Sequence, residues 1–203
     1  MSKPEVVVFD LGKVLLDFNY GVAIAKIASR SGCEPARLRT LIDQSPLLHR
    51  FETGLMTEEQ FFEEVRKSVG FPGTLAEFEE IFADIFTPIP EMIELHASLR
   101  ARGVATFIFS NTNGFAVRHI RRNYPFFSNF DGYILSYEHG SMKPSTRLYE
   151  VVEETTGRSG PSLLYLDDRP ENIDTARLRG WHTVVHSRPD ETAAIVRAAG
   201  LLG

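Results

Sequence analysis

The chain has 203 residues, 43% of them hydrophobic and 24% charged, which is the composition of an ordinary folded protein and not of a disordered one. Its formal net charge of −5 argues against nucleic acid as the main partner, because binding a phosphate backbone requires a basic surface. The single cysteine, Cys33, excludes an intramolecular disulfide, and neither an apolar run of about 18 residues nor a leader sequence is present, so we expect a cytoplasmic protein without a membrane segment.

The first predicted element is a strand over residues 6–9, Val-Val-Val-Phe, which is apolar without alternation. Such a run is typical of a strand that is covered on both faces in a parallel sheet. The strand ends at Asp10, and the chain breaks soon afterwards at Gly12. Because ligands of open α/β sheets bind at the carboxyl ends of the strands, Asp10 is a candidate active-site residue.

The stretch from about residue 20 to residue 86 shows helical spacing and almost no strand signal, which predicts an inserted helical cap. Two capping boxes mark the starts of helices within it. The boxes are Thr57 with Gln60 and Thr74 with Glu77, and the helices that they start cover residues 58–69 and 75–85.

Beyond the cap, helical and strand patterns alternate to the end of the chain. Helices are expected over residues 91–102, 114–122, 147–156, 171–179 and 190–199, and strands over residues 105–109, 132–135, 163–166 and 183–185. Such alternation indicates a doubly wound parallel sheet. We therefore predict an α/β fold in which residues 1–17 and 88–203 form the core and residues 18–87 form the cap.

Reactive side chains follow the core strands or precede their helices. Ser110 and Asn111 follow the second core strand, Lys143 precedes Pro144 and a helix, and Asp167 and Asp168 end the fourth core strand, with Asn172 four residues beyond Asp168. Each of these features alone is common in helix caps, turns and solvated surfaces. Together they place a nucleophile, a cation, anion-binding groups and a possible metal site at one edge of the sheet.

The segments FDLGKV, FSNTN, SMKPS and LDDRPEN resemble, in order and context, the four motifs of the haloacid dehalogenase superfamily of phosphohydrolases. The resemblance extends over nearly the whole chain and implies a Rossmannoid core with a small helical cap of the C1 type. It implies that Asp10 is the nucleophile, that Ser110 binds the phosphoryl group and that Lys143 is the family lysine. Asp168 matches the Mg²⁺ ligand, and Asp167 stands beside it as a supporting or alternative ligand. More closely, the chain resembles the subgroup of the α-D-glucose-1-phosphate phosphatases and the phosphatase domain of soluble epoxide hydrolase.

The chemistry expected of these groups is phosphoryl transfer. An aspartate with a pKa of about 4 is ionised at neutral pH and needs no base before it attacks phosphorus. Mg²⁺ held by Asp10, Asp168 and the backbone carbonyl of Gly12 would reduce the repulsion between the two anions. Lys143 adds a second positive charge, and Ser110 with Asn111 would bind the phosphoryl oxygens. We therefore expect a Mg²⁺-dependent phosphatase that hydrolyses a small phosphorylated metabolite, such as a hexose 1-phosphate, through an aspartyl-phosphate.

One position departs from the pattern of the family. Most of its phosphatases carry a second aspartate two residues after the nucleophile, as general acid and base, and this chain has Gly12 there. General acid or base assistance is typically worth about 10² to 10⁴ in rate. The substitution therefore favours substrates with good leaving groups, such as sugar 1-phosphates.

The cap offers a candidate substrate contact, and two other functions compete with phosphatase activity. His49, Arg50 and Glu52 precede Gly54, where they could contact the leaving group or form only a polar surface. A 2-haloacid dehalogenase would use the same Asp10 against carbon, but it needs no metal, so the Asp167–Asp168 pair argues against it. The third hypothesis is a binding protein of this superfamily with weak catalytic activity. The sequence does not determine the oligomeric state.

Overall fold

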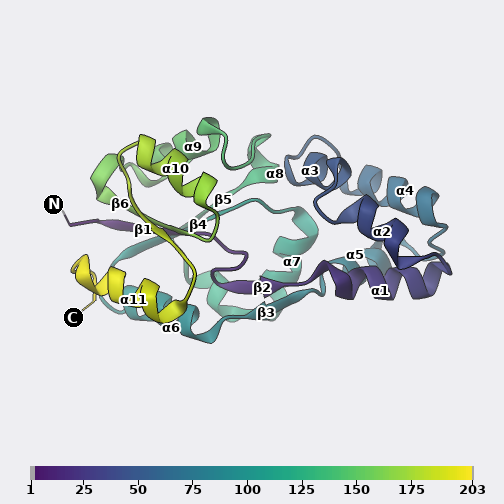
Figure 1. Cartoon of the computed structure of the whole chain (residues 1–203), viewed down its shortest axis with the longest axis horizontal. Helices are drawn as coiled ribbons and strands as arrows, with labels where there is room; N and C mark the ends of the chain where they lie inside the picture. The colour runs from purple at the N-terminus through teal and green to yellow at the C-terminus, as the bar shows by residue number, and fades with distance from the viewer. Residues whose placement is uncertain (1–2, 203) are drawn as a thin grey trace.

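The computed structural model describes residues 3–202, and it has two parts along its long axis (Figure 1). An α/β part contains both ends of the described chain, and a helical part lies at the opposite end. Within residues 3–202, no helix is long and apolar enough to cross a membrane.

The α/β part is built on a five-stranded parallel sheet in the order β5-β4-β1-β6-β7. The strands are β1 (Val6–Phe9), β4 (Ala105–Ser110), β5 (Gly132–Leu135), β6 (Leu163–Asp167) and β7 (His182–Val185). The chain leaves β1 at the centre of the sheet and adds strands to both sides of it, so the predicted doubly wound fold is confirmed.

Helices cover both faces of this sheet (Figure 1). They are α6 (Pro90–Arg100), α7 (Gly114–Asn123), α8 (Ser136–His139), α9 (Thr146–Thr156), α10 (Pro170–Leu178) and α11 (Pro189–Ala198), with short 3₁₀ turns at Pro125–Asn129 and Gly160–Ser162. The predicted helices and strands all occur, with ends that differ from the predictions by at most two residues.

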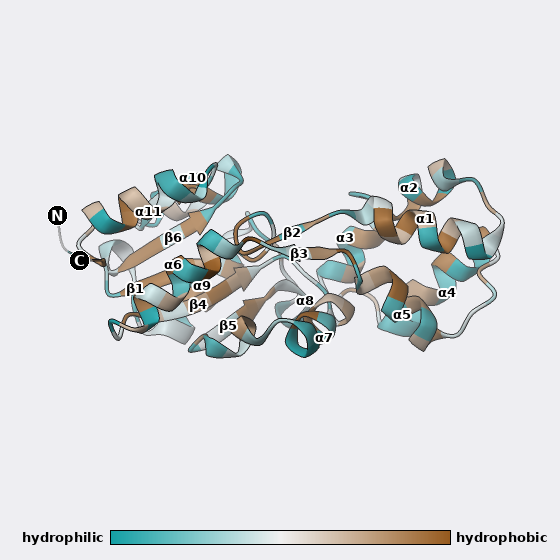
Figure 2. Cartoon of the chain, turned by 90° about the horizontal axis from the view of Figure 1, so that it is seen from below, coloured by the Kyte–Doolittle hydropathy of each residue, from teal (hydrophilic) through white to brown (hydrophobic). Residues whose placement is uncertain are grey.

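The lack of alternation in β1 reflects burial of both of its faces. Val7 and Phe9 belong to one apolar cluster, which includes residues of α6, α7 and α11. Val6 and Val8 belong to a second cluster, with residues of α9 and α10. Figure 2 shows the resulting apolar colouring along the strands β1, β4 and β6. Asp10 therefore leaves a rigid central strand at the edge where the strands end.

The helical part is made of five helices that pack on an aromatic core. They are α1 (Tyr20–Ser31), α2 (Pro35–Ile42), α3 (Pro46–Glu52), α4 (Glu58–Val69) and α5 (Leu75–Ala83). Both predicted capping boxes are present, at Thr57 and Thr74. The helix predicted to reach residue 85 ends at Ala83, because the chain turns at Asp84 towards a short strand.

A two-stranded antiparallel ribbon connects the two parts, and the sequence analysis did not predict it. It consists of β2 (Leu16–Phe18) and β3 (Phe86–Pro88). Each strand has only three residues, which is too short for a pattern of alternation to show. The predicted boundaries after residues 17 and 87 fall inside this ribbon, and the division into core and cap stays a prediction.

Arg118 of α7 links the α/β part to α4 and α5 of the helical part by ion pairs. Its two terminal nitrogens each lie 2.8 Å from one oxygen of the Glu58 carboxylate, and its Nε lies 2.8 Å from Glu79 Oε1. The fork geometry of the guanidinium fits such a bidentate contact. The pairs contribute to holding the helical part over the edge of the sheet where the strands end.

Candidate active site

A cavity of about 320 Å³ lies where the carboxyl ends of the strands face the helical part. Most of the site residues predicted from the sequence line it, namely Asp10, Gly12, His49, Ser110, Asn111, Lys143, Asp168 and Asn172. Asp167 is fully buried and contacts Lys143 and Asn172. Arg50 is exposed and does not belong to the described cavity wall, so its predicted contact with substrate is not supported.

Asp10 is held in place at the end of β1. Its Oδ1 accepts a hydrogen bond of 2.7 Å from the Leu11 N–H, and its own N–H donates to the Leu166 carbonyl of β6. Its side chain is 10% exposed, and Lys143 Nζ lies 2.9 Å from Oδ1. Burial raises the pKa of Asp10 to about 8, with Asp167 adding to the rise and Lys143 opposing it.

Lys143 has all three of its ammonium protons directed at fixed acceptors. Its Nζ lies 3.0 Å from the Phe109 carbonyl, 2.7 Å from Asp167 Oδ2 and 2.9 Å from Asp10 Oδ1. Burial alone would lower the pKa of Lys143, but the two carboxylates raise it above its usual value. The ammonium therefore stays charged next to the candidate nucleophile.

Asn111 positions this lysine through its backbone. The Asn111 side chain donates to the Lys143 carbonyl at 3.0 Å and accepts from the Lys143 N–H at 2.8 Å. Its carboxamide is thus a brace between two loops, whereas a direct contact with a phosphoryl oxygen was expected. Ser110 ends β4 beside it, and the Ser110 hydroxyl donates to the Asn111 carbonyl at 3.3 Å.

Asp167 holds neighbouring residues of the site in place, because both of its carboxylate oxygens accept hydrogen bonds from them. Oδ2 accepts from Lys143 and from the Tyr165 hydroxyl, and Oδ1 accepts from the Arg169 N–H at 2.8 Å. Asn172 donates to both oxygens, at 2.9 and 3.1 Å. Although burial opposes it, Lys143 lowers the pKa of Asp167 below its ordinary value. Of its two predicted roles, this geometry favours support over direct metal coordination.

The carboxylates fit a divalent cation. One oxygen each of Asp10, Asp167 and Asp168 lies within 4.8 Å of the other two. When all three carboxylates are ionised, they and the ammonium carry a net charge of −2, and a bound cation would favour this ionised state over the protonated Asp10 that burial favours. Hard oxygen donors are those that Mg²⁺ prefers. Asp168 is half-buried on the cavity wall, and burial followed by the charge of Asp167 raises its pKa. Gly12 lines the cavity beside Asp10, where its carbonyl was expected to take part.

The space beside Gly12 is filled by an aromatic ring. A Cβ atom at Gly12 would lie 2.9 Å from Cε1 of Phe18, closer than such contacts occur in proteins. The Phe18 ring packs against the rings of Tyr20 and Phe86, and the ammonium of Lys13 lies 4.8 Å from its centroid. The position therefore has no room for an aspartate side chain unless Phe18 moves.

The cap contributes polar side chains to the cavity that the prediction of site residues did not include. They are Tyr20, Asp43, Gln44 and Ser45, and Asn113 joins them from the α/β part. Glu52 was grouped with His49 as a possible substrate contact, and it does line the cavity. Spacing along one helix could not show which of these side chains point inward, since that depends on how α1 and α3 pack.

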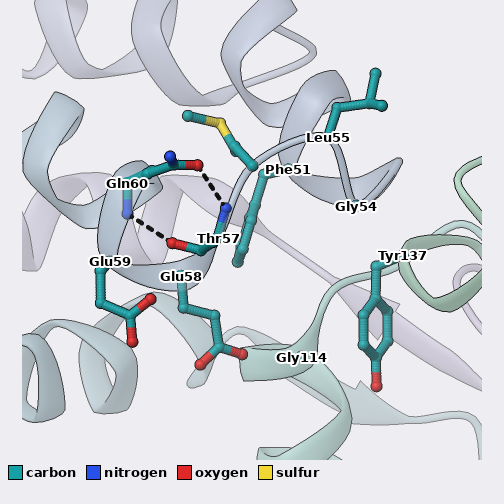
Figure 3. A pocket seen from close by; sticks show the side chains of 10 residues that line it. Phe51, Gly54, Leu55, Thr57, Glu58, Glu59, Gln60, Gly114 and Tyr137 are labelled. Atoms are coloured by element: carbon teal, nitrogen blue, oxygen red, sulfur yellow. Dashed lines mark hydrogen bonds between the residues drawn. The ribbon is translucent and has the colours of Figure 1, made fainter.

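A second pocket, of about 480 Å³, lies between the start of α4 and Tyr137 of α8 (Figure 3). Its wall includes Glu58 and Glu59, and the dashed lines in Figure 3 mark the capping box of Thr57 with Gln60. Glu58 is already paired with Arg118. The described wall contains none of the predicted catalytic residues, so the chemistry belongs to the smaller cavity.

Comparison with known proteins gives a consistent family relationship. The family model of the haloacid dehalogenase-like hydrolases matches residues 4–180. Sesquiterpene phosphatase astK of Aspergillus oryzae is 25% identical over 87% of this chain and 86% of its own, and D-ribitol-5-phosphate phosphatase of Bacteroides thetaiotaomicron is 20% identical over 87% and 89%. A solved HAD family enzyme from Bacteroides thetaiotaomicron, in complex with magnesium and inorganic phosphate, has the same fold. Its TM-score is 0.79 at 21% identity, over 91% of this chain and 94% of that one.

Proposed function

The chain belongs to the haloacid dehalogenase-like hydrolases, and from this premise we propose that it is a Mg²⁺-dependent phosphatase of small phosphorylated metabolites. The observation that carries the proposal is the arrangement around Asp10. This carboxylate lies at the wall of a cavity with Lys143 at 2.9 Å and with two further aspartates close by. Such a constellation provides a nucleophile, a fixed cation and oxygen donors for a metal in one place.

In the proposed reaction, an oxygen of Asp10 attacks phosphorus and displaces the alcohol, giving an aspartyl-phosphate. Asp10 and Asp168, with the carbonyl of Gly12, would hold Mg²⁺, which supplies positive charge at the phosphoryl oxygens and reduces the repulsion between the anions. Lys143 places its ammonium beside the reacting carboxylate, and Ser110 offers a hydroxyl to the phosphoryl group. Water then attacks the aspartyl-phosphate and restores Asp10.

For the substrate, we propose a phosphorylated sugar or sugar alcohol, such as a hexose 1-phosphate. The cap side of the cavity presents hydroxyl, amide and carboxylate groups that can hydrogen bond to hydroxyls of a leaving group. The acidic side chain of Asp43 disfavours a leaving group with a further negative charge. A relative named as a D-ribitol-5-phosphate phosphatase supports this class, whereas the sesquiterpene phosphatase argues for testing apolar esters as well.

The test is a panel of phosphate esters that includes hexose 1-phosphates, sugar alcohol phosphates and isoprenoid phosphates. Each is assayed for phosphate release with Mg²⁺ and with chelator, using the wild type and Asp10→Asn. We expect Mg²⁺-dependent release with at least one ester, and no release by Asp10→Asn although it remains folded at the assay temperature. Release that persists in chelator or in Asp10→Asn would contradict the proposal, as would release of halide from a 2-haloacid without metal.

A further inference from the structure

The site lacks an evident carrier for two protons that the proposed reaction must move. The leaving alcohol needs a proton when the ester bond breaks, and the attacking water must lose one in the second step. Gly12 has no side chain to serve, and Phe18 fills the space where one would lie. The carrier must therefore come from another part of the cavity wall.

Glu52, the last residue of α3, lies in the cavity wall and is fixed to the loop that follows β4. The Ser136 hydroxyl lies 2.5 Å from the Glu52 carbonyl and 2.9 Å from the Thr112 N–H. Gly54 brings the same segment close to the α/β part, because a Cβ there would lie 2.2 Å from the Tyr137 carbonyl and its φ is +75°. Glu52 is thus held next to the loop that follows β4 by contacts with Ser136 and Tyr137 of the α/β part.

The Glu52 carboxyl group is held in an environment that suits proton transfer. Burial raises its pKa to about 7, and hydrogen bonds from Tyr20 and Asn113 oppose the rise. The Tyr20 hydroxyl lies 3.3 Å from Glu52 Oε1. The other charged or titratable groups of the wall are Asp43 and His49 from the helical part, and Asp10, Lys13, Lys143, Asp168 and Arg169 from the α/β part.

We propose that Glu52 is the general acid and base of the reaction, in place of the aspartate that Gly12 replaces; the inference rests on the proposed phosphatase function. In the first step the bond from phosphorus to the leaving oxygen breaks as Asp10 attacks, and the Glu52 carboxyl gives its proton to that oxygen. In the second step the Glu52 carboxylate takes a proton from water while the water oxygen bonds to phosphorus. The bond to Asp10 then breaks with its electron pair on the Asp10 carboxylate, and Glu52 is protonated again.

The other groups of the wall suit this role less well. Burial, followed by the charge of Glu52, raises the pKa of Tyr20 well above 10, so its hydroxyl does not act as a base near neutral pH. The protons of Lys143 are directed at three acceptors, and Lys13 is paired with Asp17. Arg169 is paired with Glu171 on the neighbouring helix.

The test compares Glu52→Gln with Glu59→Gln, a matched cap glutamate that lines the other pocket (Figure 3). We expect Glu52→Gln to lower kcat for glycerol 2-phosphate by about 10² to 10⁴ and Glu59→Gln to leave it unchanged. With p-nitrophenyl phosphate, whose leaving group departs without a proton, Glu52→Gln should give a burst of one p-nitrophenolate per enzyme and then a slow steady state. Equal kcat values for Glu52→Gln and wild type, or a slow p-nitrophenyl reaction without a burst, would overturn the assignment.

A pH profile provides a second readout that a merely structural role would not change. For glycerol 2-phosphate, kcat/KM of the wild type should fall as pH rises through about 7, because Glu52 loses the proton that it must donate. Tyr20→Phe removes a donor that favours the carboxylate, so it should move this limb to higher pH; a limb that stays in place would contradict the inference. If the wild type hydrolyses esters and Asp10→Asn does not, full activity of Glu52→Gln rejects the Glu52 assignment alone, whereas an inactive wild type rejects the phosphatase function.

Discussion

Lys143 and Asp10 form a buried ion pair, with 2.9 Å between Nζ and Oδ1, and the lysine side chain is only 2% exposed. The same ammonium lies 2.7 Å from Asp167, so one positive charge serves two carboxylates. The candidate nucleophile is therefore held at a fixed position by a group that cannot leave without exposing two buried charges. Lys143 therefore fixes the position of Asp10 and also offsets the negative charge of Asp10 and Asp167.

Removal of this ammonium should lower the stability of the fold. Lys143→Met leaves Asp10 and Asp167 buried without a cation, which typically costs about 3 to 5 kcal/mol of unfolding free energy. Lys13→Met is the control, because Lys13 pairs with Asp17 at the surface and such pairs are worth about 1 kcal/mol or less. Urea denaturation measures both variants. Similar losses of unfolding free energy in the two variants would show that the buried pair stabilises the fold no more than the exposed pair does.

Binding of Mg²⁺ can be measured without any substrate. A ligand at about 100 times its dissociation constant stabilises the folded state by about 2.7 kcal/mol, which corresponds to about 5 to 10 °C for a chain of this size. We expect such a rise in melting temperature with Mg²⁺ for the wild type and none for Asp168→Asn. Asp174→Asn, at a carboxylate that pairs with Arg177 on α10, should keep the full rise. A full rise in Asp168→Asn would mean that the ion binds elsewhere.

The two neighbouring residues of α3 should differ in their effect on substrate binding. His49 lines the cavity and Arg50 does not, so His49→Ala should raise KM about tenfold or less, as expected for one lost hydrogen bond, and Arg50→Ala should leave it unchanged. Michaelis constants for the best ester of the panel decide the matter. An increase for Arg50→Ala, or unchanged values for both, would contradict the described cavity wall.

The sequence allowed the sheet and the positions of its reactive groups to be predicted, because parallel strands bring their carboxyl ends to one edge. Asp10 and Asp168 therefore could be assigned to one cavity from strand patterns alone. The contacts among these side chains could not be predicted in this way. That the Asn111 carboxamide braces Lys143 depends on the distance between two loops far apart in sequence.

The cap side of the site was less predictable. The helical spacing and the two capping boxes predicted helices in the cap, but not the direction in which the polar residues of α1 and α3 face the sheet. Tyr20 and Glu52 meet across 32 positions of the chain, and only the packing of the two helices brings their side chains together. The contact of Phe18 with Gly12 could not be predicted either, because Phe18 belongs to the β2–β3 ribbon, which the sequence analysis did not predict.

This last contact changes what a restored aspartate is expected to do. From the sequence alone, Gly12→Asp should raise hydrolysis of esters with poor leaving groups more than that of p-nitrophenyl phosphate. In the structure, the new Cβ would lie 2.9 Å from Phe18, whose ring is packed against Tyr20 and Phe86, so the single substitution should give little gain.

Gly12→Asp combined with Phe18→Ala should show the gain, measured as kcat for glycerol 2-phosphate relative to Phe18→Ala alone. The increase should reach about tenfold or more, within the range of general acid assistance, when Glu52→Gln removes the other proton carrier, with a smaller change for p-nitrophenyl phosphate. Equal effects on both esters would show that the missing aspartate does not limit proton transfer. Because Glu52 transfers the proton in our proposal, the increase in kcat should be larger when Glu52→Gln is also present. The carboxylate at position 12 then replaces Glu52 as the general acid and base.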